Sequence, residues 1–344
     1  MLGIKNVYIC NTEYPTKPIS TLLMATQSKQ KIALVAGGAG FVGSHLCRRL
    51  LSDGRQVVCI DNLHTGSLDN IRELMDDSRF SFIEHDIVNP LPRLGHIDEI
   101  YNLACPASPR HYQAKPLQTF FTCVSDTYHL LELARANDCP LLQASTSEVY
   151  GCATQSPQSE DYWGYVNPVG KRSCYDEGKR GAETLCMDHH HTFGTRVKIV
   201  RIFNTYGPRM SVDDGRVVSH FIVSALRGKP LTIYGDGRQT RSFMYVADLI
   251  DAICLMMKTN DNVTGPVNIG NPDERSIDEL AGITLRLTGS ASSTMHHPLP
   301  ADDPPRRCPY ITLAQTLLGW QPHVSLHDGL LQTIDYFRRV TEKE

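Results

Sequence analysis

Short apolar runs alternate with longer amphipathic segments along the first part of the chain. The apolar runs predict strands, which we place at residues 31–38, 56–61, 80–87, 97–104, 140–146 and 197–204. The amphipathic segments predict helices, of which the clearest cover residues 41–53, 116–137 and 176–193. Strands that alternate with helices indicate βαβ units, and therefore a parallel sheet with helices on both faces.

The rhythm changes after the last of these strands. Loops rich in glycine and proline, such as GPRM, GDGRQ and GNPDE, separate short elements there and indicate a smaller, loop-rich lobe. We therefore expect a sheet domain at 31–204 and the lobe at 205–344, with part of 240–275 returning to the sheet domain. Residues 1–30 show no period, and we expect a disordered extension; a targeting role and an upstream start codon both remain open.

The composition is that of an ordinary globular protein and excludes several classes of function. Of the 344 residues, 41% are apolar and the net charge is −3, so neither nucleic acid nor a polybasic contact with a membrane is expected. No apolar run approaches the ~18 residues of a membrane-spanning helix. The 11 cysteines form no CxxC pair, which is typical of reduced thiols in a cytoplasmic protein. We expect no metal site, because the consecutive residues His189, His190 and His191 do not share a helical face.

A glycine turn follows the first predicted strand and opens the first predicted helix. Its glycines permit a tight turn and a close approach to a pyrophosphate, which the N–H groups of a helix N-terminus bind. The second strand ends at Asp61, whose carboxylate suits the ribose diol of NAD and repels the 2′-phosphate of NADP. Together these features predict NAD as the cofactor and a Rossmann-type, doubly wound α/β fold. The expected cofactor contacts are Gly37, Gly40, Phe41, Val42, Gly43, Asp61, Asn62 and Asp86. For Asp86 two interpretations remain open: it contacts the adenine, or it is an ordinary carboxylate at the end of a strand.

Tyr175 and Lys179 stand four residues apart in a predicted helix and therefore share one face. A nearby cation favours the phenolate, and oxidised nicotinamide would add a second positive charge. The pair thus predicts a base that accepts a proton from a sugar hydroxyl while hydride leaves for NAD, so both side chains are also expected to contact the cofactor. The segment 145–151 extends from the carboxyl end of a predicted strand, where open α/β sheets carry their chemistry.

The glycine turn, the STSEVYG segment and the YxxxK pair resemble the extended short-chain dehydrogenase/reductase superfamily that acts on nucleotide sugars. Within it, the chain resembles the UDP-glucuronate decarboxylases through CPASP, SEDYWG, RSCYDEGKR, RIFNTYGPRM, DGRVVS, YGDGRQTR and NIGNP. The resemblance runs from about residue 31 to about residue 339. It implies a smaller C-terminal substrate-binding lobe, with the UDP-sugar between the lobe and the sheet domain, and a homodimer through helices 116–137 and 176–193.

The resemblance also implies a reaction. UDP-glucuronate is oxidised at C4, the resulting β-keto acid loses CO2, and re-reduction gives UDP-xylose with no net NADH. Thr146 joins Tyr175 and Lys179 as the catalytic triad and binds the 4-hydroxyl, and Glu148, or a water that it orients, returns a proton to C5. Arg172 faces the substrate carboxylate. The other implied substrate contacts are Tyr112, Ser147, Asn204, Tyr234 and Arg241.

Three alternatives remain open at this point. A nucleotide-sugar 4,6-dehydratase is disfavoured by Ser147. The resemblance implies that those enzymes carry Thr-Asp-Glu at this segment, with the Asp protonating the leaving hydroxyl. A serine hydroxyl is not acidic enough for that step. A 4-epimerase would use the same triad and NAD but has no use for Glu148. An NAD-binding structural or regulatory protein with a dead site would not need the intact triad.

Three positions depart from the family pattern. His220 stands where asparagine is expected, and Cys308 and Tyr310 interrupt the segment RRCPYI. The nucleotide contacts expected around Arg306 and Arg307 are therefore left open.

Overall fold

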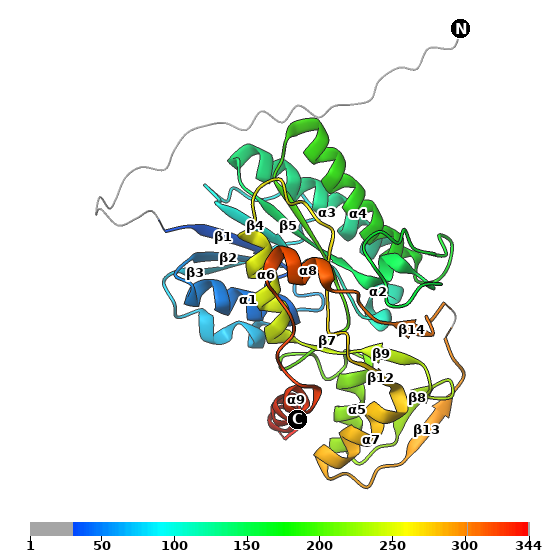
Figure 1. The fold of residues 1–344 in the computed structure, drawn as a ribbon. Helices are drawn as coiled ribbons and strands as arrows, with labels where there is room; N and C mark the ends of the chain where they lie inside the picture. The colour runs from blue at the N-terminus through cyan, green and yellow to red at the C-terminus, as the bar shows by residue number, and fades with distance from the viewer. Residues whose placement is uncertain (1–29, 301, 343–344) are drawn as a thin grey trace. The chain divides into compact units, whose positions relative to one another are not determined.

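Seven parallel strands form the central sheet, in the spatial order β11-β6-β5-β4-β1-β2-β3 (Figure 1). Their bounds are β1 (Ile32–Ala36), β2 (Gln56–Asp61), β3 (Phe80–Glu84), β4 (Glu99–Asn102), β5 (Leu141–Thr146), β6 (Val197–Ile202) and β11 (Val267–Ile269). The structure is a computed structural model and describes residues 30–300 and 302–342. The extension expected at residues 1–30 therefore lies outside the described residues, apart from its last residue.

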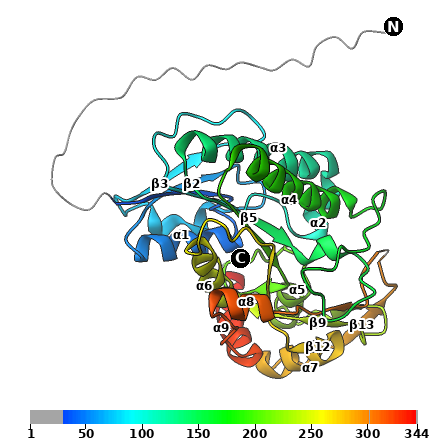
Figure 2. The ribbon, with the colours of Figure 1, turned by 45° about the horizontal axis from the view of Figure 1, so that its top comes forward.

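Helices cover both faces of this sheet (Figure 2). One face carries α2 (Pro109–Ala114), α3 (Pro116–Asn137) and α4 (Ser173–Phe193), and the other carries α1 (Phe41–Ser52), α6 (Val246–Met257) and α8 (Thr312–Leu318). Short 3-10 turns connect some of the elements: η1 (Leu68–Asn70), η2 (Arg72–Leu74) and η3 (Ser147–Tyr150). The doubly wound, Rossmann-type α/β fold expected from the sequence is confirmed.

The alternation of side chains along the strands divides the interior into two cores. In β1, Ala33 and Val35 pack into the core beneath α1 and α6, whereas Leu34 and Ala36 pack into the core beneath α3 and α4. Successive side chains of a strand point to opposite faces, so a strand covered on both faces is apolar throughout. This is why the central strands read as continuous apolar runs.

The smaller lobe is assembled from the remaining elements. It contains α5 (Val217–Leu226), α7 (Ile277–Thr288), the parallel pair β8 (Leu231–Tyr234) and β13 (Thr294–His297), and the three-stranded sheet β12 (Glu274–Ser276), β9 (Thr240–Ser242) and β14 (Arg306–Arg307). The parallel pair β7 (Thr205–Tyr206) and β10 (Met244–Tyr245) and the C-terminal helix α9 (Leu326–Thr341) complete the fold. The last strand of the central sheet, β11, comes from within the second half of the chain and pairs with β6.

The second half holds more helix than its loop-rich sequence indicates. The helix α5, VVSHFIVSAL, is buried on most of its surface, so it shows no amphipathic period. In the first half the expected helix 116–137 has the observed bounds of α3, whereas α4 begins three residues earlier than expected, at Ser173. Among the described residues, no helix is both long and apolar enough to cross a membrane.

Candidate active site

The glycine turn leaves no room for side chains between β1 and α1. A Cβ at Gly37, whose φ is +76°, would lie 2.8 Å from the backbone nitrogen of Ala104, and a Cβ at Gly43 would lie 2.1 Å from the carbonyl oxygen of Gly37. Gly40 precedes α1 and offers no side-chain cap, so the first N–H groups of the helix remain available to a ligand. A turn of this kind fits a dinucleotide diphosphate.

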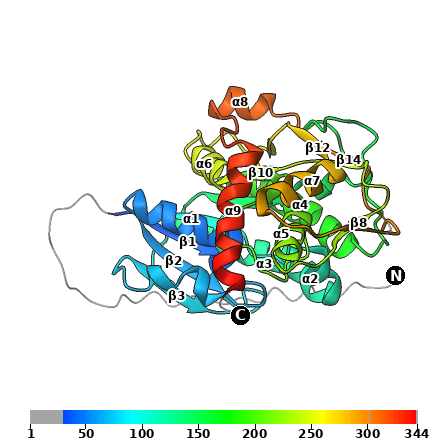
Figure 3. The same cartoon turned by 90° about the horizontal axis from the view of Figure 1, so that it is seen from below.

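This turn lies in the wall of a cavity of about 1280 Å³, the cofactor cavity. The expected cofactor contacts outside the YxxxK pair all line it: Gly37, Gly40, Phe41, Val42, Gly43, Asp61, Asn62 and Asp86. Helix α9 crosses the view of Figure 3, and its Tyr336 and Arg339 also reach the cofactor cavity. The cavity is thus lined by elements from both ends of the described chain.

Asp61 ends β2 at the rim of the glycine turn. One of its carboxylate oxygens accepts a hydrogen bond from the backbone N–H of Ala39 at 3.0 Å, and the other accepts one from Leu63 at 2.8 Å. Burial raises the pKa of Asp61, although these N–H donors act in the opposite direction. Since each oxygen has a second lone pair, the carboxylate can still accept a hydrogen bond from a ribose hydroxyl.

A second cavity of about 670 Å³, the substrate cavity, adjoins the first. Val42, Leu103 and Cys105 line both cavities. The expected catalytic and substrate-binding residues all meet in the substrate cavity: Thr146, Glu148, Tyr175, Lys179, Tyr112, Ser147, Arg172, Asn204, Tyr234 and Arg241. Tyr175 and Lys179 therefore lie in the substrate cavity, beyond the wall of the cofactor cavity.

The Tyr175 phenol is buried between a hydroxyl and a second aromatic ring. It forms a hydrogen bond with the Thr146 hydroxyl, and the Tyr112 ring stacks on it with centroids 5.0 Å apart and planes within 4°. The Nζ of Lys179 lies 5.9 Å from the centroid of the Tyr175 ring and donates a hydrogen bond to the Ala144 carbonyl at 2.8 Å. Burial raises the pKa of Tyr175, and the Thr146 hydrogen bond acts against that rise.

Glu148 is the centre of a cluster of charges on one side of the substrate cavity. Its carboxylate forms an ion pair with Arg172 and a second one with Arg307 at 3.2 Å. Burial alone would raise the pKa of Glu148, but the guanidinium groups of Arg307 and Arg172 outweigh it and lower the pKa to about 2. Glu148 is therefore a carboxylate throughout the physiological pH range.

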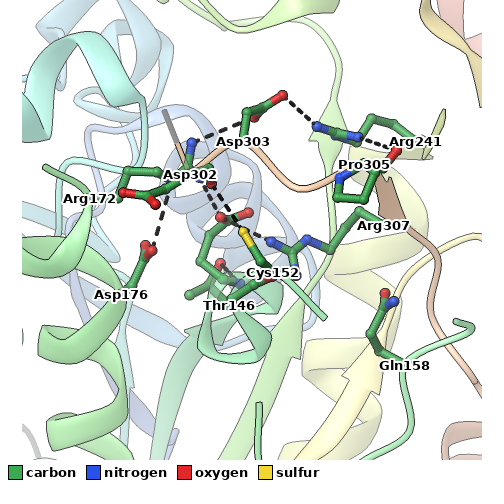
Figure 4. A network of polar contacts seen from close by, with 12 residues as sticks. Thr146, Cys152, Gln158, Arg172, Asp176, Arg241, Asp302, Asp303, Pro305 and Arg307 are labelled. Carbon is green, nitrogen blue, oxygen red and sulfur yellow. Dashed lines mark hydrogen bonds and ion pairs between the residues drawn. The ribbon is translucent and has the colours of Figure 1, made fainter. Parts of the chain in front are cut away.

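Arg172 is shared among three carboxyl groups. Besides Glu148, it lies 3.7 Å from Asp303 and 3.8 Å from Asp176, one turn along the same helix (Figure 4). Burial and the neighbouring Glu148 charge raise the pKa of Asp176 to about 8. Arg241 lies on the other side of Asp303, at 2.9 Å. The wall of the substrate cavity thus holds two guanidinium groups, those of Arg172 and Arg241, on either side of Asp303.

The other expected substrate residues differ in exposure. Ser147 and Tyr112 are buried, and within the described residues the Tyr112 hydroxyl has no hydrogen-bond partner. Tyr234 is 49% exposed at the mouth of the cavity, with its ring 6.1 Å from that of His297. Asn204 accepts a backbone hydrogen bond from Met244 at 2.9 Å.

The structure distinguishes between the residues whose roles the sequence left open. Arg307 is 1% exposed and reaches Glu148, whereas Arg306 pairs with Glu274 at the surface. The thiol of Cys308 donates a hydrogen bond to the carbonyl of Pro272 at 3.6 Å. His220 lines the substrate cavity, and its Nε2 is buried without a partner in the described part of the chain.

Sequence reasoning missed Asp303 and the role of Arg307. Asp303 lies in the segment that leads into β14, and Arg307 lies in β14 itself, 159 positions away from Glu148. The sequence offered only the charged run DDPPRR as a signal, and such a run is usually a solvated surface.

Comparisons with known proteins show the family of the chain. The model of the NAD dependent epimerase/dehydratase family matches residues 33–270. UDP-glucuronic acid decarboxylase 1 of Arabidopsis thaliana is 50% identical over 305 residues, which cover 89% of this chain and 69% of that protein. UDP-glucuronic acid decarboxylase 5 of the same plant is 49% identical, over 91% of this chain and 90% of that protein.

Solved structures of nucleotide-sugar enzymes are similar to the chain. UDP-glucuronic acid 4-epimerase from Bacillus cereus, in complex with UDP-glucuronic acid and NAD, is 33% identical with a TM-score of 0.82, over 90% of this chain and 99% of that chain. The dTDP-glucose 4,6-dehydratase DesIV from Streptomyces venezuelae is 28% identical with a TM-score of 0.83, over 91% of this chain and 98% of that chain. The fold, the glycine turn and these relatives lead to one conclusion: the chain belongs to the NAD dependent epimerase/dehydratase family, among relatives that are UDP-glucuronic acid decarboxylases.

Proposed function

We propose that the protein catalyses the NAD-dependent decarboxylation of UDP-glucuronate to UDP-xylose and CO2. The observation that carries this proposal is the pair of largely buried guanidinium groups, Arg172 and Arg241, in the wall of the cavity that holds the Tyr175 phenol. Guanidinium groups bind carboxylates and phosphates through paired donors. An acidic sugar carried on a nucleoside diphosphate offers both kinds of anion, and relatives at about 50% identity carry this activity in their names.

The chain's own residues prepare the sugar for reaction at C4. Thr146 hydrogen-bonds the Tyr175 phenol, so a sugar hydroxyl between them would donate its proton to the phenolate form of Tyr175. Lys179 stabilises that form by its charge, and its bond to the Ala144 carbonyl fixes its position. NAD, held by the glycine turn and Asp61, supplies when bound the hydride acceptor and donor for C4 and a positive charge near the phenol.

The proton for C5 comes from a water molecule in this proposal. Glu148 has a pKa of about 2 and is ionised at neutral pH, so it accepts hydrogen bonds and is not itself a proton donor. Decarboxylation breaks the C5–C6 bond and leaves an electron pair at C5, which a water oriented by the Glu148 carboxylate protonates. Ser147 carries no acidic proton at the neighbouring position, which disfavours loss of water from the sugar.

Substrate binding requires a change of partners at Arg172. In the structure this guanidinium is held by Glu148, Asp303 and Asp176. The substrate carboxylate takes the place of Asp303 and Asp176, the two more distant carboxyl groups, while Glu148 keeps the guanidinium in position. Arg241, Asn204 and Tyr234 are then left for the diphosphate and ribose.

We further propose a cytoplasmic homodimer. On α3, Leu117, Phe121 and Tyr128 share one face and are 76%, 52% and 49% exposed, which is unusual for large apolar side chains. Covering this face with the same face of a second copy would bury it. The ten cysteines of the described residues are free thiols, which fits the reducing cytoplasm. Light scattering of the purified full chain tests the dimer.

The decisive experiment is mass spectrometry of the products formed from UDP-glucuronate by the full chain. We expect CO2 and a UDP-pentose, with no accumulation of NADH. A product of unchanged mass would identify a 4-epimerase, and a 4-keto-6-deoxy product from UDP-glucose or dTDP-glucose would identify a 4,6-dehydratase. Absence of any turnover would favour a protein that binds the nucleotide sugar without chemistry.

A further inference from the structure

A buried carboxyl group without a partner lies in the wall of the cofactor cavity. Asp126, on the inner side of α3, is 0% exposed and lines this cavity. Within the described residues, neither of its carboxyl oxygens has a hydrogen-bond partner. Leaving a buried polar group unsatisfied costs about 1–3 kcal/mol, so such groups are rare unless a ligand completes them.

The surroundings of Asp126 decide its protonation. Burial raises its pKa to about 9, and two facing groups add to the rise: Asp86, which follows β3, and Cys123, one turn earlier on α3. Lys179, from α4, acts in the opposite direction without reversing the shift. At neutral pH the group is therefore a carboxylic acid, with one O–H donor and one carbonyl acceptor.

Asp86 supplies the complementary chemistry nearby. Its carboxylate accepts hydrogen bonds from the backbone N–H of Val88 at 3.2 Å and from Nε2 of Gln118 at 3.4 Å. Gln118 belongs to α3, and His129 of the same helix is hydrogen-bonded to the Ile87 carbonyl at 3.0 Å. These contacts hold the face of α3 that carries Asp126 against the loop that carries Asp86. The Asp86 acceptor and the Asp126 donor therefore line the same end of the cofactor cavity.

We propose that Asp126 is a further cofactor-binding residue, which reads the amino edge of adenine together with Asp86. On that edge, the exocyclic amine donates a hydrogen bond and the adjacent ring nitrogen accepts one. A carboxylate and a carboxylic acid side by side present the matching acceptor and donor. Hypoxanthine has a carbonyl in place of the amine and a hydrogen on the adjacent ring nitrogen, so it loses the match at both residues. The inference rests on the proposed function only in that NAD occupies the cofactor cavity.

The first test compares NAD with nicotinamide hypoxanthine dinucleotide by calorimetry on the full chain at pH 7.5. We expect the parent protein to bind the hypoxanthine analogue at least tenfold more weakly than NAD. Asp126→Leu, which removes the donor, should weaken NAD binding about tenfold or more and bring the two affinities closer together. Asp126→Asn keeps a donor and should stay within about threefold of the parent. Asp188→Asn, at an exposed position of α4, is the matched control and should behave as the parent.

The second test uses pH and does not depend on the fate of the leucine variant. ADP-ribose lacks the nicotinamide, so its binding does not depend on the chemistry around Tyr175. One pH unit above a pKa of about 9, roughly one-eleventh of Asp126 remains protonated, so the parent's affinity for ADP-ribose should fall about tenfold between pH 7.5 and pH 10. Asp126→Asn should lose less than twofold over the same range. Asp86, Cys123 and Lys179 are present in both proteins, so the difference between the two profiles reports Asp126.

Either of two results would overturn the inference. Parallel pH profiles for the parent and Asp126→Asn would mean that the acid form of Asp126 plays no part in binding. Equal parental affinity for NAD and its hypoxanthine analogue would mean that the amino edge is not read. If the parent bound neither NAD nor ADP-ribose, the cofactor assignment itself would fail, and this inference with it.

Discussion

Replacing Glu148 by glutamine tests whether one carboxylate organises the charges of the substrate cavity. The substitution keeps the shape of the side chain and removes its charge. Arg307, which is 1% exposed, then loses the carboxylate that it contacts at 3.2 Å, and Arg172 loses the carboxylate of its shortest ion pair. We expect the folded state to be destabilised, because a buried guanidinium without its partner is costly.

The magnitude follows from the pKa of the carboxyl. Folding lowers the pKa of Glu148 from 4.5 to about 2, which corresponds to about 3 kcal/mol of stability. Because the folded-state pKa is the lower one, this contribution is complete above about pH 5 and is lost as the pH falls towards 2. Breaking a buried ion pair by removing one partner typically costs about 3–5 kcal/mol, in agreement with this value. At about 2 °C per kcal/mol for a chain of this size, Tm should fall by about 6 °C or more at pH 7.

Differential scanning fluorimetry at pH 7 measures the effect. The matched control is Glu177→Gln, which removes the partner of Arg180 in a more exposed ion pair of α4 and should shift Tm by about 2 °C at most. A second substitution, Arg307→Met, made in the Glu148→Gln protein, should recover at least half of the lost stability, because it removes the unpaired charge. A Glu148→Gln protein that melts within 2 °C of the parent, with no recovery in the double variant, would refute this account of the cluster.

Three further predictions concern binding and turnover. Tyr175→Phe removes the proton acceptor with little change in volume, so turnover of UDP-glucuronate should fall about 10²–10⁴-fold. Calorimetry should show that the variant still binds UDP-glucuronate. A folded variant with more than a tenth of the parental rate would contradict the phenolate role. We expect chromatography to detect NAD in the purified parent. Gly43→Ala places a Cβ 2.1 Å from the Gly37 carbonyl oxygen, so this variant should lose the NAD. Gly282→Ala, whose Cβ meets an arginine side chain at 3.4 Å, should retain it. Arg172→Ala should weaken binding of UDP-glucuronate about ten- to a hundredfold and leave binding of UDP within about twofold; equal losses for both ligands would place Arg172 at the nucleotide instead.

Local spacing made much of the fold and part of the site predictable. Tyr175 and Lys179 are one helical turn apart, so their shared face follows from the sequence, and both line the substrate cavity. The helix 116–137 could be delimited because proline begins it and an asparagine ends it. Helix α5 was hidden, since a helix buried on most sides carries no amphipathic period.

Contacts between distant segments could not be predicted in the same way. No periodicity links Arg307 to a carboxylate 159 positions earlier, because only the packing of β14 against the sheet domain brings them together. The burial of Asp126 could not be predicted either, since a single acidic residue in a helix is normally solvated. Only the structure shows that its carboxyl group is buried in the wall of the cofactor cavity and has no hydrogen-bond partner among the described residues.

The late arrival of β11 has a consequence for the synthesis of the chain. This strand, residues 267–269, pairs with β6, and between them the chain builds much of the smaller lobe. Until residue 269 has left the ribosome, β6 is an open edge strand whose residues 197–200 are buried in the finished protein. An unpaired, apolar edge is a template for aggregation. The nascent sheet is therefore exposed to misassembly for more than 60 residues of translation, and a chain that stops after residue 204 is expected to be insoluble.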